Sequence, residues 1–410
     1  MRILHTADWH LADRLGRIDR TADLRRAVER VASYCKSEAV DVLLIAGDLF
    51  SELAGAEALR ESIRHLQQVF GRFLREGGTI LALTGNHDRE NFCQTLRHAM
   101  SLAAPLGDEP GELLPPGRLY LATEPTLLRL EDRASRLPVQ FLLMPYPTPT
   151  RYLVEGTAQR YQGLDEKNRL LMASFTSTLH DLRQGPHYSE ELPGILAAHI
   201  AVQGCDLGRL FRLSEQEDVV LTDDALLSAF HYTALGHIHR AQCIGGLPHV
   251  RYSGSIERMD LGERDDQKSV VVFDIGPDGL QGEARLLPLE STPIYEVDIA
   301  RPADELPELR RQHREARQDL VRIRCAYTAG LDNREEVLRE LEELFPRWYD
   351  REISESSTLT GTLVVGGPGR ARSFEDTVRD FIDQELANHD ETTRASVFEK
   401  VEALLKEVQG

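Results

Sequence analysis

The sequence predicts an α/β fold in which helices cover the faces of a sheet. Short apolar runs at residues 3–7, 40–46 and 79–84 have the continuous hydrophobic character of buried strands. Between them, residues 21–36 and 56–74 repeat apolar side chains at the three- and four-residue spacing of amphipathic helices. The order strand–helix–strand–helix–strand is that of an α/β sheet.

The same alternation continues along the next 160 residues. Apolar runs predict strands at residues 127–130, 139–144, 195–198 and 232–235, with a helix near 166–183. Segments around 250–256, 269–275 and 284–289 are typical of an antiparallel meander, whose turn is Gly-Pro-Asp-Gly at 276–279.

The chain changes character near residue 290. Strands at 295–299 and 320–326 and a helix at 334–344 predict a small α+β unit, and helical sequence begins at Phe374 after a loop rich in Ser, Thr and Gly. The expected organisation is a first domain at 1–290, a capping domain at 291–358, a tether at 359–370 and a helical tail at 371–410.

Composition excludes several classes of protein. The 410 residues are 41% hydrophobic and 28% charged, which is typical of a soluble globular protein of two or three domains. No apolar stretch approaches the ~18 residues of a membrane helix, and His5 and Asp8 lie where a signal peptide is apolar. Five scattered cysteines without a C-x-x-C pair fit a reducing cytoplasm. The net charge of −19 argues against coating of nucleic acid by the whole surface, but not against a local contact.

Five short clusters place Asp, Asn or His directly after a predicted strand. In chain order they are Asp8-Trp9-His10, Gly47-Asp48, Gly85-Asn86-His87-Asp88, His199 and Gly236-His237-Ile238-His239. Strand ends gather functional side chains in α/β sheets, and alternate residues of an extended chain face the same way. Because imidazole and carboxylate together suit divalent ions such as Mn, Fe, Zn or Co, the clusters predict a metal site.

The number of candidate ligands predicts two ions. Seven side chains are available, which is too many for one ion that keeps open positions: Asp8, His10, Asp48, Asn86, His199, His237 and His239. Two ions that share Asp48 as a bridge would use all of them. Two metals ~3.5–4 Å apart stabilise both the attacking and the leaving oxygen of a displacement at phosphorus. The solitary His199 alone would more often be structural, and the order of the clusters favours a ligand.

These motifs, D-x-H, G-D, G-N-H-D, H and G-H-x-H in this order, resemble the calcineurin-like metallophosphoesterases, and more narrowly the SbcD-type nuclease subunits of bacterial double-strand-break repair. The resemblance covers residues 1–290 and includes residues 252–258, which are similar to a Y-x-G-S-x-E-R segment of that family. It implies a sandwich of two central mixed sheets flanked by helices, a small α+β capping domain and C-terminal helices. Ala12 and Ser51 depart from the family pattern, and neither departure removes a ligand.

The resemblance also implies a role for each site residue. One metal would be bound by Asp8, His10, Asp48 and His239, and the other by Asp48, Asn86, His199 and His237, with Mn²⁺ as the expected ion. His87 would protonate the leaving oxygen and Asp88 would orient it, since an adjacent carboxylate keeps an imidazole protonated.

The implied function is that of a DNA nuclease: a duplex exonuclease and single-strand or hairpin endonuclease that works with an SbcC-type ATPase in repair, recombination and replication. Such a protein would be cytoplasmic and associated with the nucleoid when bound to DNA. Candidate phosphate contacts are Arg14, Arg17, Arg20, Arg89 and Arg258. Interleaved Asp13 and Asp19 also allow a self-neutralising loop around the first three arginines.

Two surfaces for protein partners are predicted. In the family, helices after the G-D and G-N-H-D motifs form a homodimer interface, which here implicates the apolar stripe Leu59, Ile63, Leu66 and Phe70; the same stripe is also expected to face the core. Residues 371–410 form two amphipathic helical patterns. They would dock onto the coiled-coil base of the ATPase, or alternatively pack on the capping domain.

Other functions were weighed against the same residues. A module that has lost its chemistry would show eroded ligands, whereas every position is filled. Purple acid phosphatases need a Tyr where Ser51 lies, and related protein phosphatases carry G-D-x-V-D-R-G in place of Gly47-Asp48-Leu49-Phe50-Ser51. A phosphoesterase of small-molecule phosphodiesters or nucleotides remains the alternative, although such enzymes usually lack the ~120 additional residues.

Overall fold

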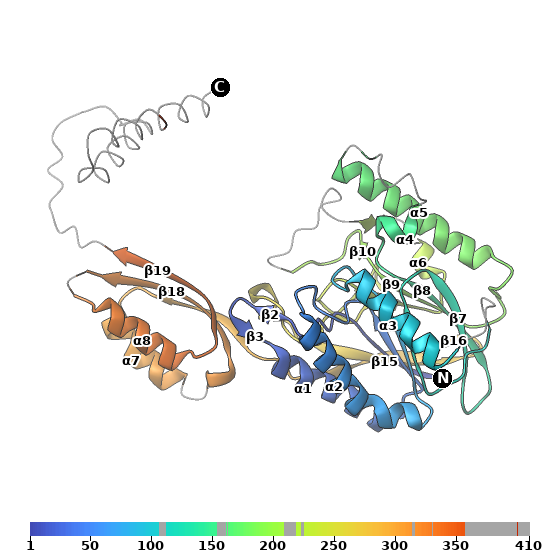
Figure 1. Ribbon diagram of the computed structural model, residues 1–410, viewed down its shortest axis with the longest axis horizontal. Coiled ribbons are helices and arrows are strands. Elements are labelled where there is room, and N and C mark those ends of the chain that lie inside the picture. Colours follow the sequence, from blue (N-terminus) through green and yellow to red (C-terminus); the bar gives the residue numbers. More distant parts are fainter. Residues whose placement is uncertain are drawn as a thin grey trace. The chain divides into compact units, whose positions relative to one another are not determined.

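Two six-stranded sheets form the centre of the molecule (Figure 1). The computed structural model describes residues 1–105, 112–153, 161, 163–208, 219–222, 225–313, 316–329, 331–356 and 400. The compact unit that these residues form is Met1–Ser356. The predicted tether and helical tail, residues 359–370 and 371–410, lie outside the described residues apart from Lys400.

The first sheet contains the strands that carry the first three motifs. Its order is β16-β15-β1-β4-β5-β6, with bounds Gly279–Pro288, Ser269–Gly276, Arg2–Thr6, Val42–Ala46, Thr79–Leu83 and Leu119–Ala122. Strands β1, β4, β5 and β6 are parallel, whereas β15 runs antiparallel to β1 and forms a hairpin with β16. The predicted turn at 276–279 is confirmed, since Gly276 pairs with Gly279.

The second sheet carries the histidine motifs. Its order is β13-β14-β12-β9-β8-β7, with bounds Gln242–Ile244, Leu247–Tyr252, Tyr232–Gly236, Gly194–His199, Pro138–Met144 and Thr126–Glu131. The four central strands are parallel, and β7 and β13 are antiparallel at the edges. The predicted meander is therefore wrong in its first element. An apolar run identifies a strand without its partner, and β14 pairs in parallel with β12.

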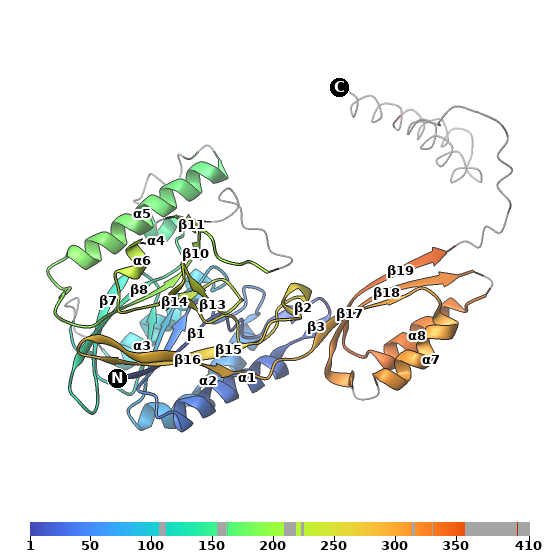
Figure 2. The same cartoon turned by 180° about the vertical axis from the view of Figure 1, so that it is seen from behind.

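Helices cover the outer faces of both sheets (Figure 2). Helices α1 (Thr21–Ser37), α2 (Ala56–Arg75) and α3 (Glu90–Ala103) pack on the first sheet, and α4 (Pro149–Tyr152), α5 (Leu164–Gln184) and α6 (Ala225–Ser228) belong with the second. Strand alternation builds this arrangement, because Leu43 packs beneath the helices while Val42 and Leu44 pack between the sheets. No helix in the described ranges has the length and apolarity needed to cross a membrane.

Short elements complete this layered body. They are β2 (Arg14–Leu15), β3 (Ile18–Asp19), β10 (Ala201–Val202), β11 (Val220–Leu221) and the 3₁₀ turn η1 (Leu261–Glu263). The expected sandwich of two mixed sheets flanked by helices is confirmed.

A smaller unit with its own apolar core follows residue 293. It contains β17 (Ile294–Ile299), α7 (Pro302–Gln312), η2 (Ala316–Gln318), β18 (Leu320–Thr328), α8 (Arg334–Leu344) and β19 (Trp348–Ser356). The strands predicted near 295–299 and 320–326 and the helix at 334–344 are present. All three strands are parallel and alternate with helices, so the unit is built from β–α–β crossovers and not from the segregated elements of an α+β unit.

Candidate metal centre

Five parallel strands bring their carboxyl ends to one site. Strands β1, β4 and β5 of the first sheet lead to Asp8, Asp48 and Asn86, while His199 ends β9 and His237 follows β12. The parallel pairing of each set puts these ends on the same edge of its sheet. Every cluster predicted from the sequence is therefore present in one site.

Several of these residues have a strained backbone. The φ angles are 54° at Asp8, 44° at His10, 51° at Asp48 and 101° at His237, all in the left-handed region that non-glycine residues rarely adopt. Such conformations cost of order 1–3 kcal/mol each and persist where the surroundings hold them, most often at functional sites. The turn after each strand thus aims a side chain that an ordinary strand end would direct elsewhere.

Glycines in the motifs allow two close approaches. A Cβ at Gly47, whose φ is +98°, would overlap the ring of His199, and a Cβ at Gly85 would overlap the carboxylate of Asp48. The Gly of G-D and the Gly of G-N-H-D therefore leave the space that neighbouring ligands occupy.

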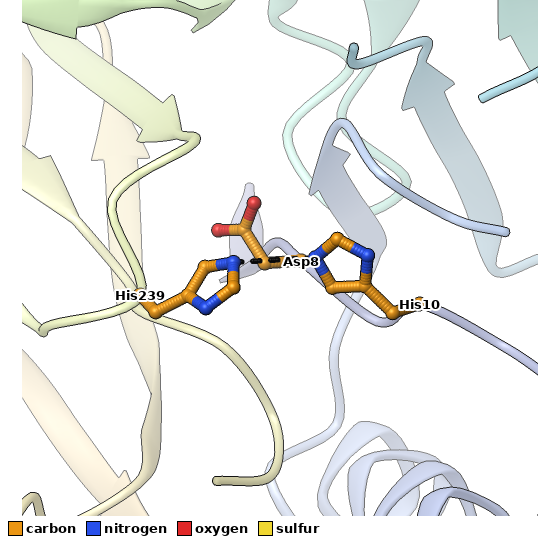
Figure 3. A group of neighbouring side chains, drawn as sticks. All are labelled: Asp8, His10 and His239. Atoms are coloured by element: carbon orange, nitrogen blue, oxygen red, sulfur yellow. Dashed lines mark hydrogen bonds between the residues drawn. The ribbon is translucent and has the colours of Figure 1, made fainter. Parts of the chain in front are cut away.

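The first group of donors consists of Asp8, His10 and His239. Figure 3 shows the rings of His10 and His239 facing one another beside the Asp8 carboxylate, with their Nε2 atoms 3.2 Å apart. One ligand atom from each of the three residues lies within 4.8 Å of the others. Ligand atoms ~2.1 Å from one ion at right angles are about 3.0 Å apart. The separation of the two nitrogens thus matches a shared cation.

The second group consists of Asn86, His199 and His237. Asn86 Oδ1 lies 2.9 Å from His199 Nε2 and 3.0 Å from His237 Nδ1. The other nitrogen of His199, Nδ1, lies 2.8 Å from the carbonyl oxygen of Ala46. A proton donated there leaves the lone pair of Nε2 directed at the site, as a metal ligand requires.

Asp48 lies between the two groups. Its Oδ2 atom is 3.6 Å from His10 Nε2 and 3.3 Å from His199 Nε2, so one oxygen faces a ligand of each group. Its Oδ1 atom accepts a 2.8 Å hydrogen bond from the backbone N–H of His87. This geometry fits a bridging carboxylate held in place by the G-N-H-D turn.

The electrostatics of the site favour positive charge. Burial lowers the pKa of His10 to about 3, so its ring is neutral and its lone pair is available. Burial also opposes a charged His199, but Asp48 and Asp8 outweigh it and raise the pKa of His199 to about 9. Burial alone would raise the pKa of Asp48, yet the imidazoles of His199 and His10 hold it well below its usual range. Buried carboxylates that attract a proton onto a neighbouring ring would equally attract a divalent cation, and the donor set fits one.

His87 lies at the open side of the site. Its side chain is 37% exposed, its ring is 5.0 Å from that of His10, and its Nδ1 is 3.6 Å from an oxygen of Glu52. Asp88 is not its partner, which corrects the orientation implied by the resemblance. The Asp88 carboxylate accepts hydrogen bonds from the backbone N–H groups of Leu49, Phe50 and Gly85, at 3.1, 2.8 and 2.9 Å.

Asp88 instead joins the two loops that carry Asp48 and Asn86. Burial and the nearby Asp48 raise the pKa of Asp88 to about 6. Its three backbone contacts fix the G-D turn against the G-N-H-D turn. The positioning of the metal ligands therefore depends on Asp88 indirectly.

Two of the predicted phosphate contacts are wrong. Arg20 is 1% exposed and pairs with Asp23 at 2.8 Å, and Glu257 lies 3.6 Å from the same guanidinium. Arg258 is partly buried and donates to the backbone oxygens of Thr292 and Asp266 at 3.3 and 2.9 Å. Both arginines anchor the chain that leads into the smaller unit.

The other three arginines are exposed, and two of them have internal partners. The guanidinium of Arg17 lies 4.4 Å from the ring centre of Trp348, and that of Arg14 donates to the carbonyl oxygen of Arg17. Arg89 donates to the carbonyl oxygen of Glu52, beside the site.

The predicted dimer stripe divides into two kinds of residue. Leu59 and Phe70 are 5% and 1% exposed and belong to the core beneath α2, which corrects their assignment to an interface. Ile63 and Leu66 are only partly buried. The amphipathic pattern could not separate the two sets, because both follow helical spacing.

Three residues near the site were not found from the sequence. Glu263 and Lys268, in a charged loop after η1, lie behind His239. Tyr146, after β8, places its ring 5.7 Å from that of His237. The charged loop resembles a solvated surface segment, so no sequence signal marked it.

Comparison with known proteins decides the family. A model of calcineurin-like phosphoesterases matches residues 1–241, more than half of the 410 residues. The chain belongs to the calcineurin-like phosphoesterases. Together with the Asp and His clusters, this makes the chain a metal-dependent hydrolase.

Similar proteins are all named as one component of the nuclease SbcCD. The chain is 28% identical over 282 residues to the SbcCD component of Rhodobacter capsulatus, covering 67% of this chain and 66% of that protein, just under two thirds of its length. It is 27% identical over 387 residues to the SbcCD component of Escherichia coli, covering 88% and 79%. The protein of the same name from Bacillus subtilis is 28% identical over 281 residues, covering 68% and 67%.

Solved structures were compared as well. A dimetal phosphatase from Danio rerio is 11% identical with a TM-score of 0.38, covering 71% of this chain and 99% of its own. A protein of Thermus thermophilus is 12% identical with a TM-score of 0.36, covering 69% and 98%.

Proposed function

We propose that this phosphoesterase is the nuclease subunit of a DNA repair complex. It would hydrolyse DNA phosphodiesters with two Mn²⁺ ions, as a duplex exonuclease and a single-strand or hairpin endonuclease. The observation that supports this most is the position of Asp48 Oδ2, which faces a histidine of each donor group at 3.6 and 3.3 Å. The similarity to an SbcCD nuclease component over 387 residues supports DNA as the substrate, because it extends beyond the phosphoesterase match.

The donor groups assign the residues of each ion. Asp8, His10 and His239 would hold one, Asn86, His199 and His237 the other, with Asp48 shared. Two bound cations would supply positive charge for the phosphoryl oxygens and lower the pKa of the attacking water. A groove of about 150 Å³, lined by residues including Asp48, Asn86, His87, His237 and His239, leads to this point.

His87 has the position of a general acid. It lies beside both donor groups but is more exposed than the ligands that surround it, as a group facing the substrate should be. A proton on its ring would pass to the oxygen that leaves phosphorus. Glu52, 3.6 Å from its Nδ1, is the carboxylate placed to orient the ring.

The substrate is tested with the purified chain. Linear duplex, hairpin and single-stranded DNA would be incubated with Mn²⁺, Mg²⁺ or Zn²⁺, alongside a chromogenic phosphodiester and small nucleotides. Cleavage of DNA with Mn²⁺ is the expected result. Hydrolysis of the chromogenic and small substrates without cleavage of any DNA would favour the small-molecule alternative.

The chain is also proposed to act as a homodimer. A cavity of about 760 Å³ opens between α2, α3 and β6, lined by Ile63, Leu66, Leu96 and Met100 among other residues. An apolar recess of this kind on a monomer marks an interaction site. The second copy is the occupant that the family resemblance implies.

Replacing Leu66 with Glu should therefore give monomers. A carboxylate in an apolar interface loses its water without gaining a partner, which costs several kcal/mol and shifts association by orders of magnitude. Sedimentation at micromolar concentration would show the change, and the chromogenic substrate should still be hydrolysed. Leu286→Glu is the matched control, since Leu286 is 52% exposed on β16. A wild-type chain that sediments as a monomer would contradict the dimer.

The proposed ATPase partner follows from the names of the relatives alone. They are components of a nuclease called SbcCD, and the segment proposed to bind the ATPase, residues 371–410, lies outside the described residues apart from Lys400. The proposed location is the cytoplasm, on the nucleoid when DNA is bound.

A further inference from the structure

Glu263 contacts the metal ligand His239 from behind. Its Oε1 atom lies 2.7 Å from His239 Nδ1, on the side of the ring opposite Nε2. The Nε2 atom faces His10. Glu263 is only 8% exposed, so this hydrogen bond is formed away from bulk water.

The carboxylate of Glu263 is itself held by three donors. Its Oε2 atom accepts from Lys268 Nζ at 2.6 Å, from the backbone N–H of Met259 at 3.1 Å and from Ser255 Oγ at 3.3 Å. Lys268 is 3% exposed. One oxygen is thus fully used for anchoring, and the other is left for the histidine.

The backbone of His239 is fixed by the same segment. Its carbonyl oxygen accepts hydrogen bonds from Lys268 Nζ at 3.0 Å and from the backbone N–H of Ser255 at 3.1 Å. Gly254, with φ +77°, packs its Cα against that carbonyl, and a Cβ there would lie 2.7 Å from the oxygen. Residues 254–268 therefore hold His239 at both its main chain and its ring.

We propose that Glu263 is a positioning residue for metal binding, anchored by Lys268, which fixes the ring of His239 with Nδ1 protonated and Nε2 available to the first ion. The inference rests on the proposed two-metal function, because the ring needs a fixed tautomer only as a ligand. A carboxylate that accepts from the other nitrogen of a metal-bound histidine orients the ring and strengthens it as a donor.

A purely structural role for the Glu263–Lys268 pair predicts different behaviour. Removing one partner of a buried pair leaves an uncompensated charge and destabilises the fold as a whole. Such a change would lower stability without selecting one metal site. Loss of positioning would instead weaken the first ion and leave the second, whose ligands Asn86, His199 and His237 do not contact Glu263.

The test compares the full-length wild type with Glu263→Gln. Titration with Mn²⁺, followed by calorimetry and by electron paramagnetic resonance, should show one of two sites weakened about 10–100-fold and the other unchanged. In the metal-free protein, nitrogen NMR of ¹⁵N-labelled histidine should show the Nδ1–H tautomer of His239 in the wild type and a mixture of tautomers in the variant. Two sites of wild-type affinity together with an unchanged tautomer would overturn the proposal.

Controls separate positioning from folding and from the proposed function. Asp132→Asn removes a carboxylate of similar burial, 5% exposed, which bonds to Ser135 in the turn between β7 and β8, and it should leave both metal sites intact. If Glu263→Gln does not fold, Glu263→Asp keeps the charge beside Lys268 but shortens the reach, and it should weaken the same site. A wild type that binds two ions but cleaves no DNA would refute the nuclease function alone.

Discussion

Asp48→Asn is expected to lower hydrolysis by about 1,000-fold or more and to reduce the metal content from two ions per chain to one or none. The amide keeps the size of the side chain but loses the charge that both donor groups face. A bridging carboxylate is an interaction of several kcal/mol, and each 1.4 kcal/mol is a factor of ten in rate. Elemental analysis of the dialysed protein and the rate on the chromogenic phosphodiester measure the two effects.

Asp274→Asn provides the matched control for this substitution. Asp274 is on β15 and pairs with Arg2 at the amino-terminal end of β1, the opposite end from Asp8. We expect its metal content and rate to equal those of the wild type. Two ions retained by Asp48→Asn at full affinity would show that Asp48 is not shared.

The first sheet and the metal ligands were predictable because local sequence determines them. Parallel strands buried on both faces need continuous apolar runs, and such runs end where the chain turns at Gly47 or Gly85. The polar residue after each turn then lies at the carboxyl end of a strand without further information. The positive φ angles at Asp8 and Asp48 carry no such signal, since neither residue type requires them.

Helix α3 and strand β19 were missed because their patterns are weak. Only Cys93 is buried within α3, so it has no wide apolar stripe. Strand β19 has the sequence WYDREISES, in which charged residues on the exposed face pair with Arg322 and Arg324 of β18. Parallel pairing in the smaller unit depends on crossovers that local patterns do not specify.

The errors at Asp88 and Arg20 share one physical cause. Proximity in sequence suggested that Asp88 orients His87 and that Arg20 extends the loop after His10 toward phosphate. Neighbouring side chains on an extended turn point in different directions, and Asp88 turns inward to three backbone N–H groups. Arg20 is likewise buried against Asp23 and Glu257, a residue far along the chain that no local pattern connects with it.

His87→Gln is expected to reduce the cleavage of DNA by about 100- to 10,000-fold while both ions stay bound, because loss of a general acid removes a contribution of that size. The loss should depend on the leaving group. A nucleoside alkoxide needs a proton as it departs, whereas a nitrophenolate leaves as a stable anion, so hydrolysis of the chromogenic substrate should fall far less. Comparing the two rates at saturating Mn²⁺ therefore measures proton donation separately from metal binding.

The alternative role for His87 is as a metal ligand, since its ring nitrogen lies within 4.8 Å of ligand atoms of His10 and Asp48. In that case His87→Gln would lose metal, and both substrates would slow by the same factor. His98→Gln, at an exposed position on α3, is the matched control and should change neither rate nor metal content. The exposure of His87 and its contact with Glu52 favour the acid, because a ligand would be enclosed as His10 and His199 are.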